Sequence, residues 1–473
     1  MRIELNGKIN GTYVQTLCAM FFHGEKFPKD SSNEEKYIIV STNETENGIE
    51  CTCELFANGK KENGFGFCAF SSDEPYERTS KTAVGKAVYE AGVRITGKSI
   101  PWGILTGIRP SKVANELILT HGEEKALEIL KNRYLLSNSK AALAVQVAKN
   151  EYSILSHSTD NTCSVYISIP FCPSRCSYCS FISYATPKLF KLIPDYVRKL
   201  LEDIKSTFNQ IKKDGLRVIS IYIGGGTPTV LNENELEQIL KEISNQIDTS
   251  KLLEFTLEAG RPDTITAKKL EVAKSYGVSR ISVNPQTLND DVLKIIGRRH
   301  TAKEFLDAFS LVKESGIEHI NTDLIAGLEN DTFDSFKQTV DKIIELEPDN
   351  ITVHSFCVKK SAQILQDNSD IYSKFDDDAI RSVDYVREVL AKKGYEPYYM
   401  YRQKNTVSDL ENVGYAKKNS FGIYNVLMMA DIHTVYGIGA GATTKIVKFN
   451  NQTLQIDRIF SPKYPYEYLQ DKQ

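Results

Sequence analysis

The sequence contains no apolar run approaching the roughly 18 residues that a membrane span needs. Neither sign of charge dominates, because 58 lysine and arginine residues face 61 aspartate and glutamate residues. This balance gives no electrostatic reason to expect a nucleic-acid partner or a polybasic membrane-binding surface. The first ten residues, MRIELNGKIN, lack the apolar segment of a signal peptide, so we expect a cytoplasmic protein.

The composition has no extreme either, since 41% of the 473 residues are hydrophobic and 25% are charged. These values exclude disordered, collagen-like and coiled-coil chains and allow sizeable cores. Length and element pattern predict three domains. They are an N-terminal α+β domain of unknown role at residues 1–160, a β/α region at residues 161–356, and a C-terminal α+β extension on the substrate side at residues 357–473.

The middle region alternates strand-like and helical patterns, which is typical of parallel β/α units. Six such units favour a partial (β/α)6 barrel over a closed barrel of eight. In barrels of this kind the chemistry lies at the carboxyl ends of the strands. The predicted strands are Ser164–Ile169, Val218–Ile223, Leu253–Glu258, Val278–Val283, His319–Ile325 and Asn350–Phe356.

Nine cysteines need an explanation, because thiols in the cytoplasm stay reduced. Cys51 and Cys53 fall on one face of a predicted strand and are expected to be small core residues. Cys172, Cys176 and Cys179 instead form a C-x3-C-x2-C cluster just after the first strand of the β/α region.

Clustered thiolates favour zinc or an iron–sulfur cluster. A structural zinc site needs four ligands, and the nearest additional candidates, Cys163 and His157, precede the strand. Three thiolates suit a four-iron cluster in which one iron stays open to chelate a small molecule. Three core cysteines would be the alternative, but the intervening Pro173, Ser174 and Arg175 are not typical of a core segment.

This spacing at the end of a first barrel strand resembles the radical S-adenosylmethionine (SAM) superfamily. The segments Tyr166-Ile-Ser-Ile-Pro-Phe-Cys172 and Tyr178-Cys179-Ser-Phe181 are similar to the oxygen-independent coproporphyrinogen III oxidase family, and most similar to its coproporphyrinogen dehydrogenase (HemZ) branch. The resemblance implies an α/β fold with a partial (β/α)6 radical SAM barrel. It also implies a 4Fe–4S cluster held by the three clustered cysteines, with SAM as second cofactor.

A glycine-rich segment, Gly224–Thr229 (GGGTPT), follows the second predicted strand. Glycines let a ligand approach the backbone and its hydrogen-bonding groups. The family resemblance assigns the methionine end of SAM to Gly225, Gly226 and Thr227. A phosphate-binding P-loop does not fit, because no lysine follows.

Single polar residues lie at or beyond the ends of later strands, as expected for a ligand edge. The resemblance implies that each of them contacts SAM, with Arg299 as an alternative to its neighbour for the SAM carboxylate. Tyr166 is implied to order SAM or the substrate, and we predict that it is a catalytic residue. The other implied contacts are Glu258 to the ribose, Gln286, Arg298 to the carboxylate, and Asp323 to the ribose or adenine.

The activity implied by the resemblance is radical oxidative decarboxylation. A 5′-deoxyadenosyl radical made from SAM takes a hydrogen atom from a propionate of coproporphyrinogen III, and two rounds give protoporphyrinogen IX. Such a reaction needs an electron donor such as a flavodoxin or ferredoxin. Arg402 and Lys404 are generic candidates for binding substrate carboxylates.

Two departures from the family pattern keep an alternative open. Phe181 stands where the oxidases have a fourth cysteine, and Glu411 begins E-N-V-G-Y-A where the related heme chaperones have an H-N-x-x-Y-W heme motif. The alternative is a heme-binding or heme-transfer protein. Its axial ligand would come from His433, Met428 or Met429.

Overall fold

The computed structural model describes residues 1–28, 35–72, 74–179, 185–357, 376–403, 406, 410–450 and 453–470. The described chain forms two compact units, one of residues 1–149 with 400–409 and one of residues 150–399 with 410–473. The division into three domains remains a prediction. Within the described ranges, no helix combines the length and apolar character needed to cross a bilayer.

The first unit is a four-stranded sheet of order β1-β2-β3-β4 with α1 and α2 packed against it. Strand β1 is parallel to β2, and the other neighbours are antiparallel. Cys51 and Cys53 are 1% and 2% exposed in its core, as predicted. Its elements are β1 (Arg2–Asn6), α1 (Gly11–Phe21), β2 (Tyr37–Thr45), β3 (Gly48–Ala57), β4 (Lys60–Ala69), α2 (Tyr76–Thr96), α3 (Pro110–His121) and α4 (Glu123–Asn132), with α5 (Asn138–Leu155) continuing into the second unit.

The second unit contains the β/α region, and all six predicted strands are present there. The strands are β5 (Thr162–Ile169), β6 (Arg217–Gly225), β7 (Glu254–Glu258), β8 (Arg280–Ser282), β9 (His319–Ala326) and β10 (Asn350–Ser355). The helices between them are α6 (Pro187–Phe190), α7 (Ile193–Lys213), α8 (Glu233–Gln246), α9 (Ala267–Ser275), α10 (Asp290–Ile295), α11 (Ala302–Ser315) and α12 (Phe333–Leu346), with three short 3₁₀ turns, η1 (Pro228–Val230), η2 (Thr249–Lys251) and η3 (Pro262–Thr264).

The C-terminal segment adds strands to both sides of these six. The order over the described residues is β11-β12-β10-β9-β8-β7-β6-β5-β13-β14-β15. Strands β5 to β10 are parallel to one another and β13 is parallel to β5, whereas β12 is antiparallel to β10. The added elements are α13 (Asp376–Lys392), β11 (Tyr395–Arg402), β12 (Glu411–Lys417), α14 (Ile423–Met429), β13 (Thr434–Ile438), β14 (Thr443–Asn450), β15 (Thr453–Phe460) and α15 (Pro465–Gln470).

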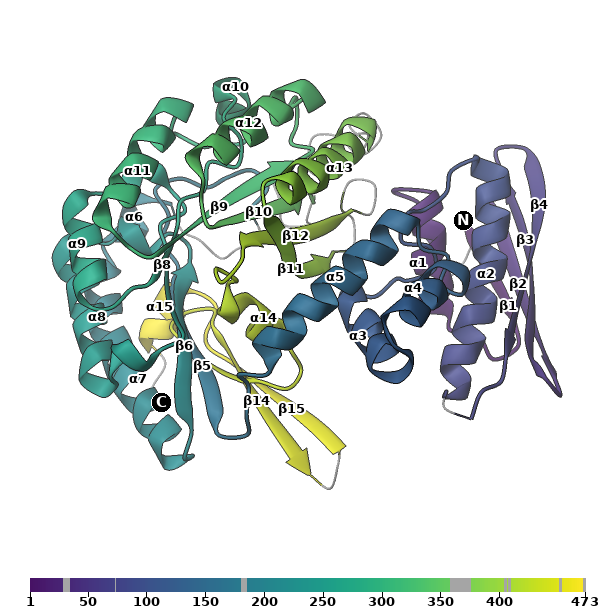
Figure 1. Ribbon diagram of the computed structural model, residues 1–473, viewed down its shortest axis with the longest axis horizontal. Helices are drawn as coiled ribbons and strands as arrows, with labels where there is room; N and C mark the ends of the chain where they lie inside the picture. The colour runs from purple at the N-terminus through teal and green to yellow at the C-terminus, as the bar shows by residue number, and fades with distance from the viewer. Residues whose placement is uncertain are drawn as a thin grey trace. The chain divides into compact units, whose positions relative to one another are not determined.

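The parallel strands have one apolar side and one polar side. Helices α7, α8, α9, α11 and α12 form an arc along the outer side of the sheet (Figure 1), where fully buried side chains such as Ile167, Ile221 and Leu257 are found. The alternate positions carry Tyr166, Tyr222 and other polar residues, because successive strand side chains point to opposite faces. The inner side of the partial barrel therefore presents side chains that can bind a polar ligand.

Candidate functional site

The three clustered cysteines lie in the loop that follows β5, at the carboxyl edge of the parallel strands. Cys172 and Cys176 are each 9% exposed, and Cys179 is half-buried. The Cys172 Sγ is 3.4 Å from the Thr227 Oγ1 of the glycine-rich segment. No group of three His, Cys, Asp or Glu side chains in the described ranges is placed to hold a single metal ion. A four-iron cluster does not require three side chains to converge on one ion, because each thiolate binds a different iron.

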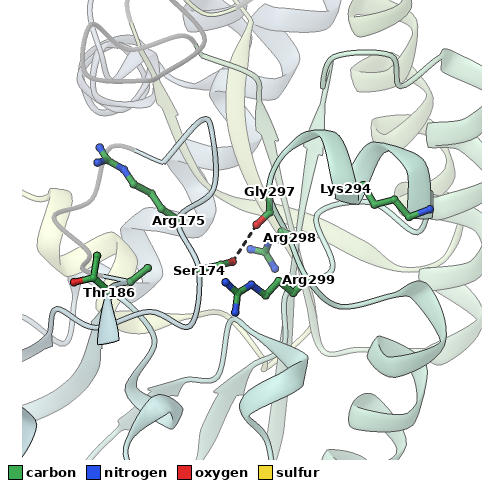
Figure 2. A pocket seen from close by; sticks show the side chains of 8 residues that line it. Ser174, Arg175, Thr186, Lys294, Gly297, Arg298 and Arg299 are labelled. Atoms are coloured by element: carbon green, nitrogen blue, oxygen red, sulfur yellow. Dashed lines mark hydrogen bonds between the residues drawn. The ribbon is translucent and has the colours of Figure 1, made fainter. Parts of the chain in front are cut away.

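The cysteine loop is tied to the loop after α10 and to the end of β7. Ser174 Oγ donates to the Gly297 carbonyl at 3.0 Å (Figure 2), and the Ser177 N–H donates to the Ile296 carbonyl at 3.0 Å. Arg261 donates to both the carbonyl and the Oγ of Ser174, at 3.3 and 2.8 Å. These bonds fix a loop that has no regular secondary structure of its own.

The glycine-rich segment lies directly against the cysteine loop. The Gly226 and Thr227 N–H groups donate to the carbonyls of Ile169 and Phe171 at 2.8 and 2.7 Å. A Cβ at Gly226 would lie 2.5 Å from the Phe171 carbonyl oxygen, and Gly225 has a φ of 107°. Only glycine meets both demands without a shift of the backbone. The segment is thus placed beside the cysteines, and its contact with SAM remains a prediction.

Arg298 is buried between the cysteine loop and the strand ends. Its Nη1 donates to the carbonyls of Gly260 and Asn284 at 3.0 and 2.6 Å, and its Nη2 donates to the Tyr178 Oη at 3.3 Å. Burial lowers its pKa, but Tyr178 and Cys176 outweigh this effect and hold the pKa above its usual value. Three of its contacts thus fasten the edge of the sheet together, and its contact with the SAM carboxylate remains a prediction.

Glu258 ends β7 beside the glycine-rich segment. The Tyr222 Oη donates to its Oε1 at 2.5 Å. Burial raises the pKa of Glu258 to about 7, with a further increase from Asp323, while the hydrogen bonds from Tyr222 and the Gly225 backbone lower it. A carboxylate placed here can accept hydrogen bonds from ligand hydroxyls.

Asp323 lies two strands away on the same edge and is held by amides. Asn284 and Asn321 donate to its two oxygens at 2.9 Å each, and the His354 Nε2 is 3.8 Å from its Oδ2. Burial raises the pKa of Asp323, but His354 and the hydrogen bonds from Asn321 and Thr352 outweigh it, so the pKa stays below its usual value. Asp323 is thus an ionised acceptor at neutral pH.

Gln286 follows β8 in a left-handed conformation, with a φ of 71°. Its backbone pairs with β9, donating to the Asp323 carbonyl at 3.1 Å and accepting from the Ile325 N–H at 3.0 Å. Its Oε1 is buried without a hydrogen-bond partner in the described chain. A non-glycine residue at positive φ costs about 1–3 kcal/mol, and such strain clusters at functional sites.

Tyr166 belongs to a group of three stacked rings inside the partial barrel. Its ring centroid is 6.1 Å from that of Tyr222 and 6.2 Å from that of Tyr424, and the latter two are 4.6 Å apart. Burial raises the pKa of Tyr166, so its phenol stays protonated. Tyr424 comes from α14, which the sequence analysis did not connect with the site.

A basic pocket lies on the flank of the cysteine loop (Figure 2). Its volume is about 640 Å³, and none of its lining residues is acidic. The lining residues are Ser174, Arg175, Ala185, Thr186, Lys294, Gly297, Arg298 and Arg299. Sequence analysis considered Arg299 only as an alternative SAM contact and did not identify the pocket.

The residues considered for other ligands lie elsewhere. His433 is 1% exposed, and its two ring nitrogens contact the hydroxyls of Ser158 and Ser164 at 2.8 and 2.9 Å. Burial, with a smaller effect of Lys445, lowers its pKa to about 4. Arg402 is in the first unit, over the ring of Trp102. Phe181 and Lys404 lie outside the described residues.

The residues present fit an anionic cluster and a polar ligand. Two buried guanidiniums, those of Arg261 and Arg298, contact the cysteine loop, and cations beside thiols suit thiolate ligands. The Gln286 Oε1 and two Arg261 nitrogens are buried without hydrogen-bond partners in the described chain, although buried polar groups are normally satisfied.

Comparisons with known proteins identify relatives of this chain. The profile of the Radical SAM superfamily matches residues 166–343. The chain is 32% identical over 466 residues to the oxygen-independent coproporphyrinogen-III oxidase-like protein HemZ of Bacillus subtilis, covering 96% of this chain and 92% of that protein. It is 33% identical over 282 residues to the heme chaperone HemW of Lactococcus lactis, covering 59% and 69%.

The fold also has a counterpart among solved structures. The coproporphyrinogen III oxidase HemN of Escherichia coli, described as a radical SAM enzyme, superimposes with a TM-score of 0.50. The match covers 63% of this chain and 67% of that one at 21% identity, a level that establishes the fold alone. The predicted α/β class with a partial radical SAM barrel is confirmed.

Proposed function

The chain belongs to the HemN/HemZ-like family of radical SAM enzymes, and we propose that it catalyses oxygen-independent oxidative decarboxylation of coproporphyrinogen III to protoporphyrinogen IX. Its cofactors are a 4Fe–4S cluster and SAM. When bound, they would supply the radical chemistry that abstracts a hydrogen atom from a substrate propionate. The observation that carries the proposal is the meeting of three cysteines and five strand ends at one edge of the sheet.

In this proposal Cys172, Cys176 and Cys179 hold the cluster. The backbone groups of Gly225 and Gly226 bind the methionine end of SAM, because their lack of a side chain lets a ligand approach closely. Thr227 keeps this loop against Cys172.

Two carboxylates are placed to hold the nucleoside of SAM. Glu258 and Asp323 both offer acceptor oxygens on the inner side of the barrel and share a polar setting with Tyr222 and Asn284. The Gln286 Oε1 is free to accept a further hydrogen bond. The ring group of Tyr166 closes the inner side and excludes water from the reacting centre.

The proposed electron donor is a flavodoxin or ferredoxin, a small acidic protein that reduces the cluster. The basic pocket supports this proposal, because four of its eight lining residues are cations and it shares Ser174 and Arg175 with the cysteine loop. Exposed charges of opposite sign speed the encounter of two proteins and make it sensitive to salt.

The decisive experiment is product analysis under anaerobic conditions. The cluster-loaded protein is given SAM, a strong reductant and coproporphyrinogen III, and the oxidised porphyrins are weighed by mass spectrometry. Stepwise loss of two carboxyl groups is expected. Formation of methionine and 5′-deoxyadenosine with an unchanged porphyrin would show that the substrate is wrong.

Heme binding is a second candidate, supported by the similarity to HemW. His433 does not favour it, because Ser158 and Ser164 occupy both of its ring nitrogens. Glu411 and Asn412 are buried within β12, at 1% and 2% exposure. A protein that binds heme stoichiometrically, with a spectrum altered by His433→Ala, would support this candidate over the first.

A further inference from the structure

Arg261 is a buried cation whose hydrogen-bonding capacity is only partly used. It follows β7 by three residues, is 3% exposed, and donates through Nη1 to the carbonyl and Oγ of Ser174. Its Nε is 3.4 Å from the Asp263 carboxylate. Its Nε and Nη2 are nevertheless buried without a hydrogen-bond partner among the residues described.

Positive charge is in excess around this side chain. Arg298 is also buried here, and among the described residues the only carboxylate within 4 Å of the Arg261 guanidinium is that of Asp263, which is a quarter exposed. Burial lowers the pKa of His300 to about 3, with smaller contributions from the charges of Arg298 and Arg261. Buried cations are costly unless an anion compensates them.

The two guanidiniums with this excess of positive charge lie beside the cysteine loop. Arg261 contacts Ser174, which stands between Cys172 and Cys176, and Arg298 contacts Tyr178, which stands between Cys176 and Cys179. Asp263 balances only one of the two charges, so a further anion is best supplied by three thiolates and the cluster that they carry. Charge and hydrogen bonding near a cluster set its reduction potential.

We propose that Arg261 is a positioning residue that fixes the cysteine loop through Ser174 and raises the reduction potential of the cluster through its buried charge. The inference rests on the proposed cluster site but not on the substrate. Reduction adds one negative charge to the cluster, so a nearby guanidinium stabilises the reduced state. Removing that charge makes the cluster harder to reduce.

Three variants separate the two roles. Arg261→Met removes the charge and the hydrogen bonds, Arg261→Lys keeps the charge, and Ser174→Ala keeps the charge but removes the Oγ contacts. Each is reconstituted with iron and sulfide, and the midpoint potential is measured by redox titration monitored by electron paramagnetic resonance, without substrate.

We expect a more negative midpoint potential for Arg261→Met, with values close to that of the unmodified protein for Arg261→Lys and Ser174→Ala. If Arg261→Met binds a full cluster at an unchanged potential, the tuning role is wrong. If Arg261→Met fails to fold, Arg261→Lys is compared with Arg261→Gln, which lacks the charge. Equally negative midpoint potentials in these two variants would also overturn the tuning role.

The positioning role is tested on the metal-free protein by maleimide labelling of the three loop cysteines. Labelling is done at a pH above the thiol pKa, so that loss of the Arg261 cation does not change the thiolate fraction. Arg261→Met and Ser174→Ala should then label several-fold faster than the unmodified protein, because the loop loses its anchor. Cys51 and Cys53 serve as internal controls, since both are buried and burial raises the pKa of Cys51 to about 12. Unchanged labelling in both variants would refute the positioning role. Neither readout depends on coproporphyrinogen, so a wrong substrate would leave both results standing.

Discussion

The two edges of the parallel strands β5 to β10 differ in whether their buried charges have partners within the protein. At the amino edge, Arg280 and Glu254 form a buried ion pair at 3.0 Å. The other Arg280 nitrogens donate to Asn350 and to the carbonyls of Ser420 and Phe421. Glu254 also accepts from the N–H groups at 423 and 424, where α14 begins. Each of these charges is therefore compensated by the protein itself.

At the carboxyl edge the buried charges are left partly uncompensated. Two Arg261 nitrogens and the Gln286 Oε1 are buried without a hydrogen-bond partner in the described part of the chain, although Asp263 lies 3.4 Å from the Arg261 Nε. Burial also raises the pKa of Glu258 to about 7, so its ionised form is costly until a ligand hydroxyl compensates it. In this sheet, the satisfied buried charges at the amino edge stabilise the fold, whereas the partly unsatisfied groups at the carboxyl edge lie where a ligand is expected.

The largest effect should come from a cluster ligand at the carboxyl edge. Cys176→Ala is expected to abolish the brown chromophore and reduce SAM cleavage to the detection limit, with the fold largely intact. Cys163→Ala is the matched control, because Cys163 is fully buried in β5 and burial raises its pKa to about 12. Absorbance and the yield of 5′-deoxyadenosine are the readouts. A Cys176→Ala protein that still cleaves SAM would overturn the cluster assignment.

At the amino edge the same kind of change should affect stability instead. Arg280→Met leaves the Glu254 carboxylate without its cation and is expected to lower the free energy of unfolding by about 3–5 kcal/mol. Urea denaturation measures this loss, and the folded protein should keep its affinity for SAM. Arg198→Met removes an exposed pair with Asp195 and should cost about 0–1 kcal/mol. Equal losses in the two variants would contradict the comparison.

Glu258→Gln should weaken SAM binding by about 10–100-fold, since a hydrogen bond to a charged group contributes about 1.5–3 kcal/mol. Because the pKa of Glu258 is about 7, SAM affinity of the unmodified protein should rise as pH increases through 7. The variant should lack this rise, as measured by calorimetry on cluster-loaded protein. Glu237→Gln, on the exposed side of α8, should behave as the unmodified protein. A pH profile that Glu258→Gln leaves in place would assign the titration to another group.

The same pKa predicts a pH effect on stability. A carboxyl whose pKa is raised on folding holds more protons in the folded than in the unfolded state between about pH 4.5 and 7. Its contribution to stability is therefore largest at low pH and declines as pH rises through this window. In Glu258→Gln the decline should disappear from the pH dependence of urea denaturation.

The smallest effect should come from the exposed rim of the carboxyl edge. Arg175→Glu with Lys294→Glu is expected to slow reduction by flavodoxin by about tenfold or more at low salt, because steering by charge is lost. Dithionite, a small reductant, should reduce both proteins at the same rate. Lys251→Glu, an exposed change at the amino edge, is the control. If Lys251→Glu slows reduction equally, the basic pocket does not steer the electron donor.

Much of the second unit could be predicted because its periodicities are strong. All six barrel strands were predicted within a few residues. In the first unit, β4 lacks a strand pattern with apolar side chains on its inner face, because Gly64 and Gly66 occupy that face where α2 comes close. A Cβ at either position would lie 2.0 Å from a carbonyl oxygen of α2. Close packing of this kind places glycine on the buried face and leaves Phe65 and Phe67 on the exposed face, which inverts the usual hydrophobic alternation.

The residues of the site likewise divide into those with a local sequence signal and those that only the fold brings together. The cysteines were predictable from local spacing, and the single polar residues from strand ends together with family resemblance. Arg261 carries no local signal, since only the fold brings it to Ser174. The placement of Tyr424 beside Tyr166 likewise joins segments more than 250 residues apart, which the pattern of neither segment indicates.

Hydrogen–deuterium exchange with and without SAM, on cluster-loaded protein, tests the contrast between the two edges most directly. The account predicts that SAM protects peptides covering 224–227, 258–261 and 284–286, while 420–424 at the amino edge is unchanged. Protection of 420–424 to the same extent, or no protection at the carboxyl edge, would contradict it.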